Sequence, residues 1–254
     1  MNPTVRSVLD AVESRVGYLR AADTWPDEEG WVRCDRLGPD ELAGAVDAGM
    51  AARGALDRQV AASLLAQSYA FKVGATSLAA YALGLPWPSP AAVDTAVRLQ
   101  GGKASGLACL GALGDPDDVD GLGAAFLDRH IDNFLDALRA GSRVGTRLLW
   151  GNVAASCAAA FRAVEGAARD RGDTAERAQI RRRAEDFFAS ARRLEGTGRF
   201  EIVEAARRDG WYWTRTSCCL WFRLADAGTC DDCSLIPAAE LAGRRRAELE
   251  GARR

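Results

Sequence analysis

The sequence predicts a mainly α protein, with a helical body over residues 1–195 and a small irregular module over residues 196–254 that holds one or two short strands. Three observations support this prediction. Apolar residues recur with near-helical spacing through most of the first part, beginning with Val5, Val8 and Val12. The last part lacks this spacing and is rich in aromatic residues. Four of the seven cysteines also lie there, within sixteen residues.

Local signals place the first elements. Pro3 suits the first turn of a helix, and the apolar residues after it keep near-helical spacing. Proline and glycine then break the pattern before residues 31–34, which can form a short strand. Asp40 is a suitable N-cap for a helix that reaches Ala52.

A long helix is expected over residues 56–83, whose many Ala and Leu residues indicate burial on most sides. Gly74 is a candidate interruption of this helix. A group of prolines ends it, and Ser89 can cap a further helix. These prolines are Pro86, Pro88 and Pro90.

The middle of the chain is predicted to be a loop followed by helices. Residues 101–120 are rich in Gly and Asp and favour a loop. The apolar residues of 119–140 form one stripe, which predicts a strong helix. The next helix is expected to begin near Gly145 or after Asn152, and another is expected over residues 174–194.

The arginine triplet 181–183 lies on this last helix and is interpreted as a solvated face. Residues 200–203 can form a strand in the C-terminal module. Pro237 is expected to start a final charged helix that frays at Arg253 and Arg254.

Composition restricts the class of protein. The formal net charge is −2 and the sequence pI is about 5.6, which argues against nucleic acid as the main partner. Asp10 and Glu13 occupy the place where a signal peptide would be apolar. No apolar run reaches the length of roughly 18 residues that a transmembrane segment needs. We therefore expect a cytoplasmic protein.

The single histidine, His130, excludes several kinds of site. The chain has no HExxH motif, no multi-histidine metal site and no Rieske-type cluster. We expect His130 to be structural or half-exposed. Three isolated cysteines in apolar surroundings are predicted to be small core residues: Cys34, Cys109 and Cys157.

The other four cysteines, Cys218, Cys219, Cys230 and Cys233, form the pattern C-C-x10-C-x2-C. Crowded thiolates are favourable only around a shared cation, so the pattern indicates a metal or cluster site. In a reducing compartment such cysteines are ligands rather than disulfide partners.

Zinc and an iron–sulfur cluster are the main alternatives. Cys230 and Cys233 fit one half of a structural zinc site, but Cys218 and Cys219 do not, because adjacent side chains diverge. A [2Fe–2S] cluster needs four thiolates and offers ligand positions on separate iron atoms, so the spacing favours it. Zinc, other iron–sulfur forms and free thiols remain open alternatives.

The neighbours of the motif bear on such a cluster. Arg215 and Arg223 flank it and would favour the reduced, more negative form, whereas Asp231 and Asp232 act in the opposite sense. Nearby aromatic residues either shield a cluster from water or pack in the core. They are Trp211, Trp213, Trp221 and Phe222.

Residues 215–224 and 229–233 closely resemble the C-terminal motif of the FhuF-like ferric siderophore reductases. The four cysteines match that motif one for one, spacing included. Residues 149–152 are also similar to a family segment, although an ordinary helix start explains them equally well. The resemblance implies that the four cysteines hold a [2Fe–2S] cluster. It also implies that the helical body, which in this family is similar to part of the siderophore synthetases, has a siderophore-sized groove.

The resemblance further implies an activity, namely reductive release of iron from a ferric siderophore, expected to be of the hydroxamate type. One electron converts the hard ferric ion into ferrous iron, which oxygen donors hold less tightly. No nucleotide or flavin motif is visible, so an external donor such as a ferredoxin or a flavoprotein is needed. The alternatives are a zinc-stabilised scaffold protein and an iron–sulfur electron carrier or sensor. Residues that contact the substrate are not predicted.

Overall fold

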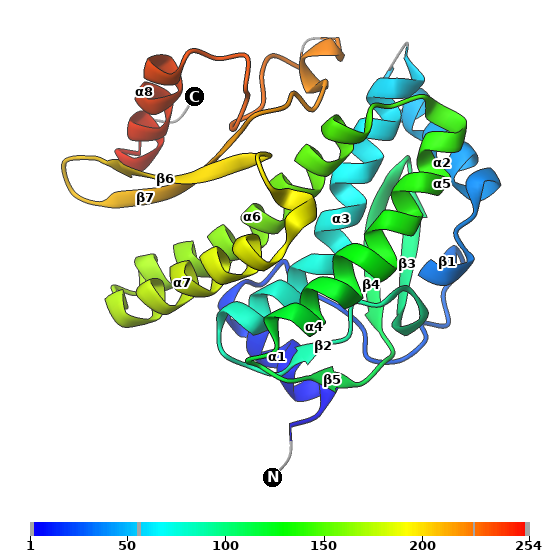
Figure 1. Cartoon of the computed structure of the whole chain (residues 1–254), viewed down its shortest axis with the longest axis horizontal. Coiled ribbons are helices and arrows are strands. Elements are labelled where there is room, and N and C mark those ends of the chain that lie inside the picture. Colours follow the sequence, from blue (N-terminus) through cyan, green and yellow to red (C-terminus); the bar gives the residue numbers. More distant parts are fainter. Residues whose placement is uncertain (1–2, 55–56, 226, 252–254) are drawn as a thin grey trace.

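The computed structural model describes residues 3–54, 57–225 and 227–251, and it is mainly α-helical (Figure 1). The helices are α1 (Val5–Arg15), α2 (Pro39–Arg53), α3 (Arg58–Ala82), α4 (Val119–Gly123), the π-helical η3 (Ala124–Ile131), α5 (Asp132–Ser142), α6 (Thr146–Asp170), α7 (Thr174–Ser190) and α8 (Ala238–Leu249). The strands are β1 (Trp31–Arg33), β2 (Trp87–Pro88), β3 (Thr95–Gln100), β4 (Lys103–Cys109), β5 (Leu113–Gly114), β6 (Gly198–Glu204) and β7 (Asp209–Arg215). Short 3₁₀ turns are η1 (Cys34–Arg36), η2 (Ala92–Asp94), η4 (Arg192–Leu194) and η5 (Trp221–Arg223).

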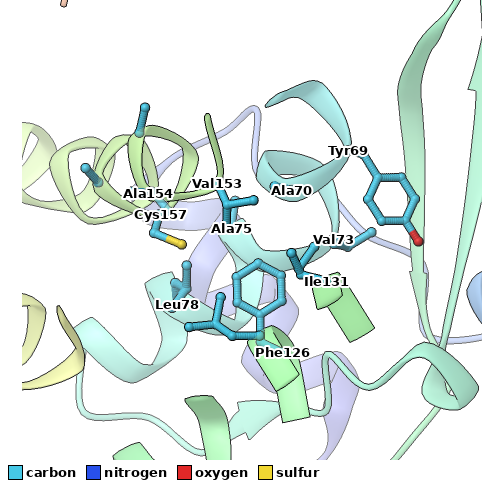
Figure 2. Packing of buried hydrophobic residues seen from close by; sticks show 14 of the residues in the cluster. Tyr69, Ala70, Val73, Ala75, Leu78, Phe126, Ile131, Val153, Ala154 and Cys157 are labelled. Carbon is cyan, nitrogen blue, oxygen red and sulfur yellow. The ribbon is translucent and has the colours of Figure 1, made fainter. Parts of the chain in front are cut away.

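Two long helices, α3 and α6, pack against each other at the centre of the protein (Figure 1). As predicted, α3 is buried on most sides. Gly74 does not interrupt it. A Cβ at Gly74 would lie 2.3 Å from Cζ of Phe126, so the missing side chain lets this fully buried ring reach the helix. Figure 2 shows Phe126 among Val73, Leu78 and other apolar side chains of this core.

Most expected boundaries agree with the structure to within a few residues. The helix α1 begins after Thr4, which accepts a hydrogen bond from the Ser7 backbone, so Pro3 precedes the cap. Gly38 caps α2 in place of Asp40, because Pro39 already occupies the first helical position. The predicted helix over 119–140 is a continuous helical run of α4, η3 and α5. Gly145 caps α6, so the first of the two predicted starts is confirmed.

The prediction of a helix after Ser89 and a loop over residues 101–120 was wrong. Ser89 donates to Asp94 Oδ2 at 2.6 Å instead of capping a helix. The chain then forms an antiparallel sheet in the order β1-β3-β4. The adjacent residues Gly101 and Gly102 have φ values of 54° and 69°, which favours a tight turn between β3 and β4.

The C-terminal part consists of the antiparallel hairpin β6–β7, the cysteine-bearing segment and α8. Figure 1 shows the hairpin extending beside α6 and α7, with α8 against it. Pro237 caps α8, in agreement with the sequence. The predicted fraying of Arg253 and Arg254 lies outside the described residues. Within those residues, no helix is long and apolar enough to cross a membrane.

The interpretation of residues 181–183 as a solvated face holds only for Arg182. Arg181 donates to Glu165 and also to Asp209 Oδ2, the latter at 2.9 Å. Arg183 pairs with Asp117 at 2.6 Å. These ion pairs tie α7 to α6, to β7 and to the chain before α4. Sequence spacing could not reveal them because the acidic partners are distant along the chain.

His130 is a buried structural residue with 1% exposure, and it is not half-exposed. Its Nδ1 lies 2.6 Å from the Pro90 carbonyl oxygen and its Nε2 lies 2.6 Å from the Tyr69 hydroxyl. A carbonyl oxygen only accepts, so Nδ1 carries the proton and Nε2 accepts from Tyr69. Burial lowers the pKa of His130 from 6.5 to about 4, against a smaller raising effect of the Pro90 hydrogen bond.

We expect His130 to make stability depend on pH. The unfolded chain binds a proton with a pKa of 6.5 and the folded chain with a pKa of about 4. The contribution is therefore complete above pH 6.5 and is lost as the pH falls toward 4, by up to about 3 kcal/mol. Urea unfolding of the unmodified protein and of His130→Gln, from pH 7.5 to 5, measures this. Equal slopes of the unfolding free energy against pH in the two proteins would contradict it.

Candidate metal centre

The structure brings the four predicted cysteines together in the segment between β7 and α8. Cys218 and Cys219 follow β7 directly, and Cys230 and Cys233 form a turn in which the Cys233 N–H donates to the Cys230 carbonyl oxygen at 3.3 Å. The Sγ atoms of Cys219 and Cys230 are 3.5 Å apart. Two thiolates on one tetrahedral metal, with bonds of about 2.3 Å, lie roughly 3.8 Å apart. This pair is therefore close to the spacing of ligands on one metal atom.

The four thiols also affect one another electrostatically. Their mutual hydrogen bond raises the pKa of Cys230 and lowers that of Cys219 to about 6. Burial raises the pKa of Cys218, and the Cys219 and Cys233 thiols raise it further. Within the described residues, however, no group of three or more Cys, His, Asp or Glu side chains is placed to share one metal ion. The thiols gather in one place without forming a single-ion site.

Backbone donors turn toward the sulfurs at the start of η5. Leu220 has a φ of 66°, in the left-handed region. Its N–H donates to Cys218 Sγ at 3.3 Å, and the Trp221 N–H donates to the Cys219 thiol and lowers its pKa. Donors to sulfur stabilise negative charge there. The neighbouring Leu220 and Leu224 seat η5 against the start of α3.

Arg215 ends β7 and places a buried cation beside the thiols. The residue is 2% exposed, and its charge lowers the pKa of Cys219. Its Nη2 donates to Asn152 Oδ1, and its Nη1 lies 3.9 Å from Asp232 Oδ2. Its buried Nε and Nη1 have no hydrogen-bond partner. A buried cation with unused donors is costly alone. The surroundings therefore fit an anionic group bound at the cysteines.

Two residues of the helical body hold this region in place. Asn152 Nδ2 donates to Ser63 Oγ at 2.8 Å, and Ser63 Oγ donates to the Cys219 carbonyl oxygen at 2.7 Å. Both residues are fully buried. A Cβ at Gly151 would lie 1.8 Å from Ser217 Oγ, so the glycine permits close approach of the cysteine segment. Residues 149–152 thus lie inside α6 and contact the candidate site.

The sequence did not single out Ser63. The available signal was a polar residue within an otherwise Ala- and Leu-rich stretch, where a buried hydroxyl needs a partner.

The other predicted neighbours have different roles. Arg223 pairs with Asp57 at 3.0 Å. Trp211 stacks on Phe200 and Trp213 packs against Phe188, so these two tryptophans are core residues. Trp221 and Phe222 are 38% and 45% exposed, respectively. The isolated Cys34, Cys109 and Cys157 are buried, as predicted, and none of the seven cysteines forms a disulfide.

These features define an iron–sulfur protein whose cysteine loop rests on a helical body. Residues 215–235 match the family model described as FhuF 2Fe-2S C-terminal domain. No curated protein and no solved structure matches the chain. The match contains all four cysteines and confirms the resemblance over this segment. The cofactor of the site is accordingly a [2Fe–2S] cluster.

Proposed function

We propose that the protein is a ferric-siderophore reductase, in which Cys218, Cys219, Cys230 and Cys233 hold the [2Fe–2S] cluster. The observation that carries the proposal is the FhuF-type match over residues 215–235, where the four thiols gather. The 3.5 Å separation of Cys219 and Cys230 suits two ligands of one iron atom, and Cys218 and Cys233 would then hold the other.

When bound, the cluster supplies a one-electron couple, so one electron from a ferredoxin or flavoprotein donor reduces chelated Fe(III) to Fe(II). Arg215 stabilises the added negative charge with its buried guanidinium. The Leu220 N–H does the same at Cys218. Asn152 fixes the position of Arg215, and Ser63 anchors the Cys219 backbone. None of these residues needs to exchange a proton, which agrees with a chain whose single histidine is buried in the core.

Stopped-flow mixing tests the activity. The anaerobically purified protein is reduced and mixed with the ferric complex of a trihydroxamate siderophore or with ferric citrate. We expect cluster bleaching to be at least tenfold faster with the siderophore. Equal rates would leave an electron carrier or sensor. A colourless protein with one zinc ion and no iron would instead support the zinc-stabilised scaffold.

A further inference from the structure

A groove between α3 and α6 lies beside the cysteine segment and has a volume of about 320 Å³. Residues from α2, α3, α6 and η5 line it. Among them are Arg53, Leu64, Gln67, Phe71, Ala159 and Trp221.

The groove begins one helical turn beyond the contacts that hold the cysteine segment. Ser63 binds the Cys219 carbonyl, and Gln67 follows four residues later, about 6 Å along α3. On α6, Ser156 likewise follows Asn152 by four residues and donates to the Gln67 carbonyl oxygen at 2.8 Å. Trp221 is two residues after Cys219, so their Cα atoms are at most about 7 Å apart. A molecule in the groove would therefore lie close to the cluster.

The walls of the groove are largely apolar. Leu64, Phe71 and the partly exposed Trp221 supply this surface. Arg53 is the only charged residue among those that line it. The Arg53 Nη1 donates to the Gly102 carbonyl oxygen at 3.2 Å, and its other N–H groups and the Gln67 amide make no hydrogen bond within the described residues. An apolar groove with a few free donors suits a ligand of low net charge that carries oxygen acceptors.

We propose that this groove binds a ferric siderophore of the trihydroxamate class, an inference that rests on the proposed function. Three hydroxamate groups balance the charge of Fe(III), so the complex has a nearly neutral core. Three catecholate groups would leave a strongly negative complex, which Arg53 alone cannot neutralise. Arg53 and Gln67 donate to hydroxamate oxygens, and Trp221 packs against the apolar spacer of the ligand.

Filling the groove tests this assignment. The variant Ala159→Trp places an indole there from α6 without altering the cysteine segment, and Ala189→Trp adds the same group to an exposed position on α7. The probe is the gallium(III) complex of a linear trihydroxamate siderophore, which is redox-inert, and calorimetry measures its affinity. We expect Ala159→Trp to weaken binding at least tenfold and Ala189→Trp to leave it unchanged. The absorption spectrum of the cluster should be the same in both variants.

Unchanged affinity in Ala159→Trp, or no binding to the unmodified protein, would overturn the assignment. Tighter binding of a gallium(III) tricatecholate complex, weakened by the same variant, would overturn the choice of hydroxamate. Failure of the reductase proposal looks different. The gallium complex would then bind in the groove, but the reduced protein would react with the ferric siderophore no faster than with ferric citrate. That outcome supports the binding site and rejects the activity.

Discussion

Replacing Cys219 with serine is expected to abolish the [2Fe–2S] cluster. A serine hydroxyl is a poor ligand for iron compared with a thiolate, and Cys219 has the closest sulfur contact at the site, 3.5 Å from Cys230. Iron content should fall from about two atoms per chain to near zero. The visible absorption and the EPR signal of the reduced protein should disappear with it.

The matched control for this experiment is Cys34→Ser. Cys34 is buried, and hydrogen bonds with Thr95 and Tyr69 counteract the burial that raises its pKa, so a hydroxyl there finds partners. This variant should keep the iron and the spectrum. Far-UV circular dichroism establishes that both variants are folded. A Cys219→Ser protein with full iron content and an unchanged spectrum would contradict the proposed ligand set.

Arg215→Leu is expected to lower the midpoint potential of the cluster by about 100 mV. The arginine is buried beside the thiols, and its positive charge favours the reduced form. A unit charge at about 6 Å, with an effective dielectric constant of about 20, contributes roughly 3 kcal/mol, or about 120 mV for a one-electron couple. Redox titration followed by EPR measures the shift.

Two further variants separate charge from structure. Arg215→Lys keeps the charge, so its potential should stay within about 40 mV of the unmodified protein. Arg223→Leu removes a partly exposed arginine that pairs with Asp57, and solvent screens its charge. Its potential should change little. If Arg215→Leu has the potential of the unmodified protein, Arg215 does not stabilise the reduced cluster.

Turn chemistry explains where sequence reasoning about the fold succeeded and failed. The helices α3, α6 and α7 have long apolar patterns with clear ends, and they were predicted well. The β3–β4 hairpin was missed because Gly101 and Gly102 were interpreted as a loop. Its strands are stabilised by pairing with each other and with β1, which is distant in sequence. Such pairing is a tertiary property that local propensity does not report.

The sequence by itself determined the chemistry of the site, because ligand type and spacing are local: four cysteines in one short segment already specify a cluster-binding loop. Only the tertiary structure decided which neighbours act on it. Arg215, Asn152 and Ser63 are far apart along the chain, yet they form one buried hydrogen-bonded network behind the loop. Burial also distinguishes Arg215 from Arg223, because a cation away from water keeps its influence on a nearby charge and an exposed one is screened.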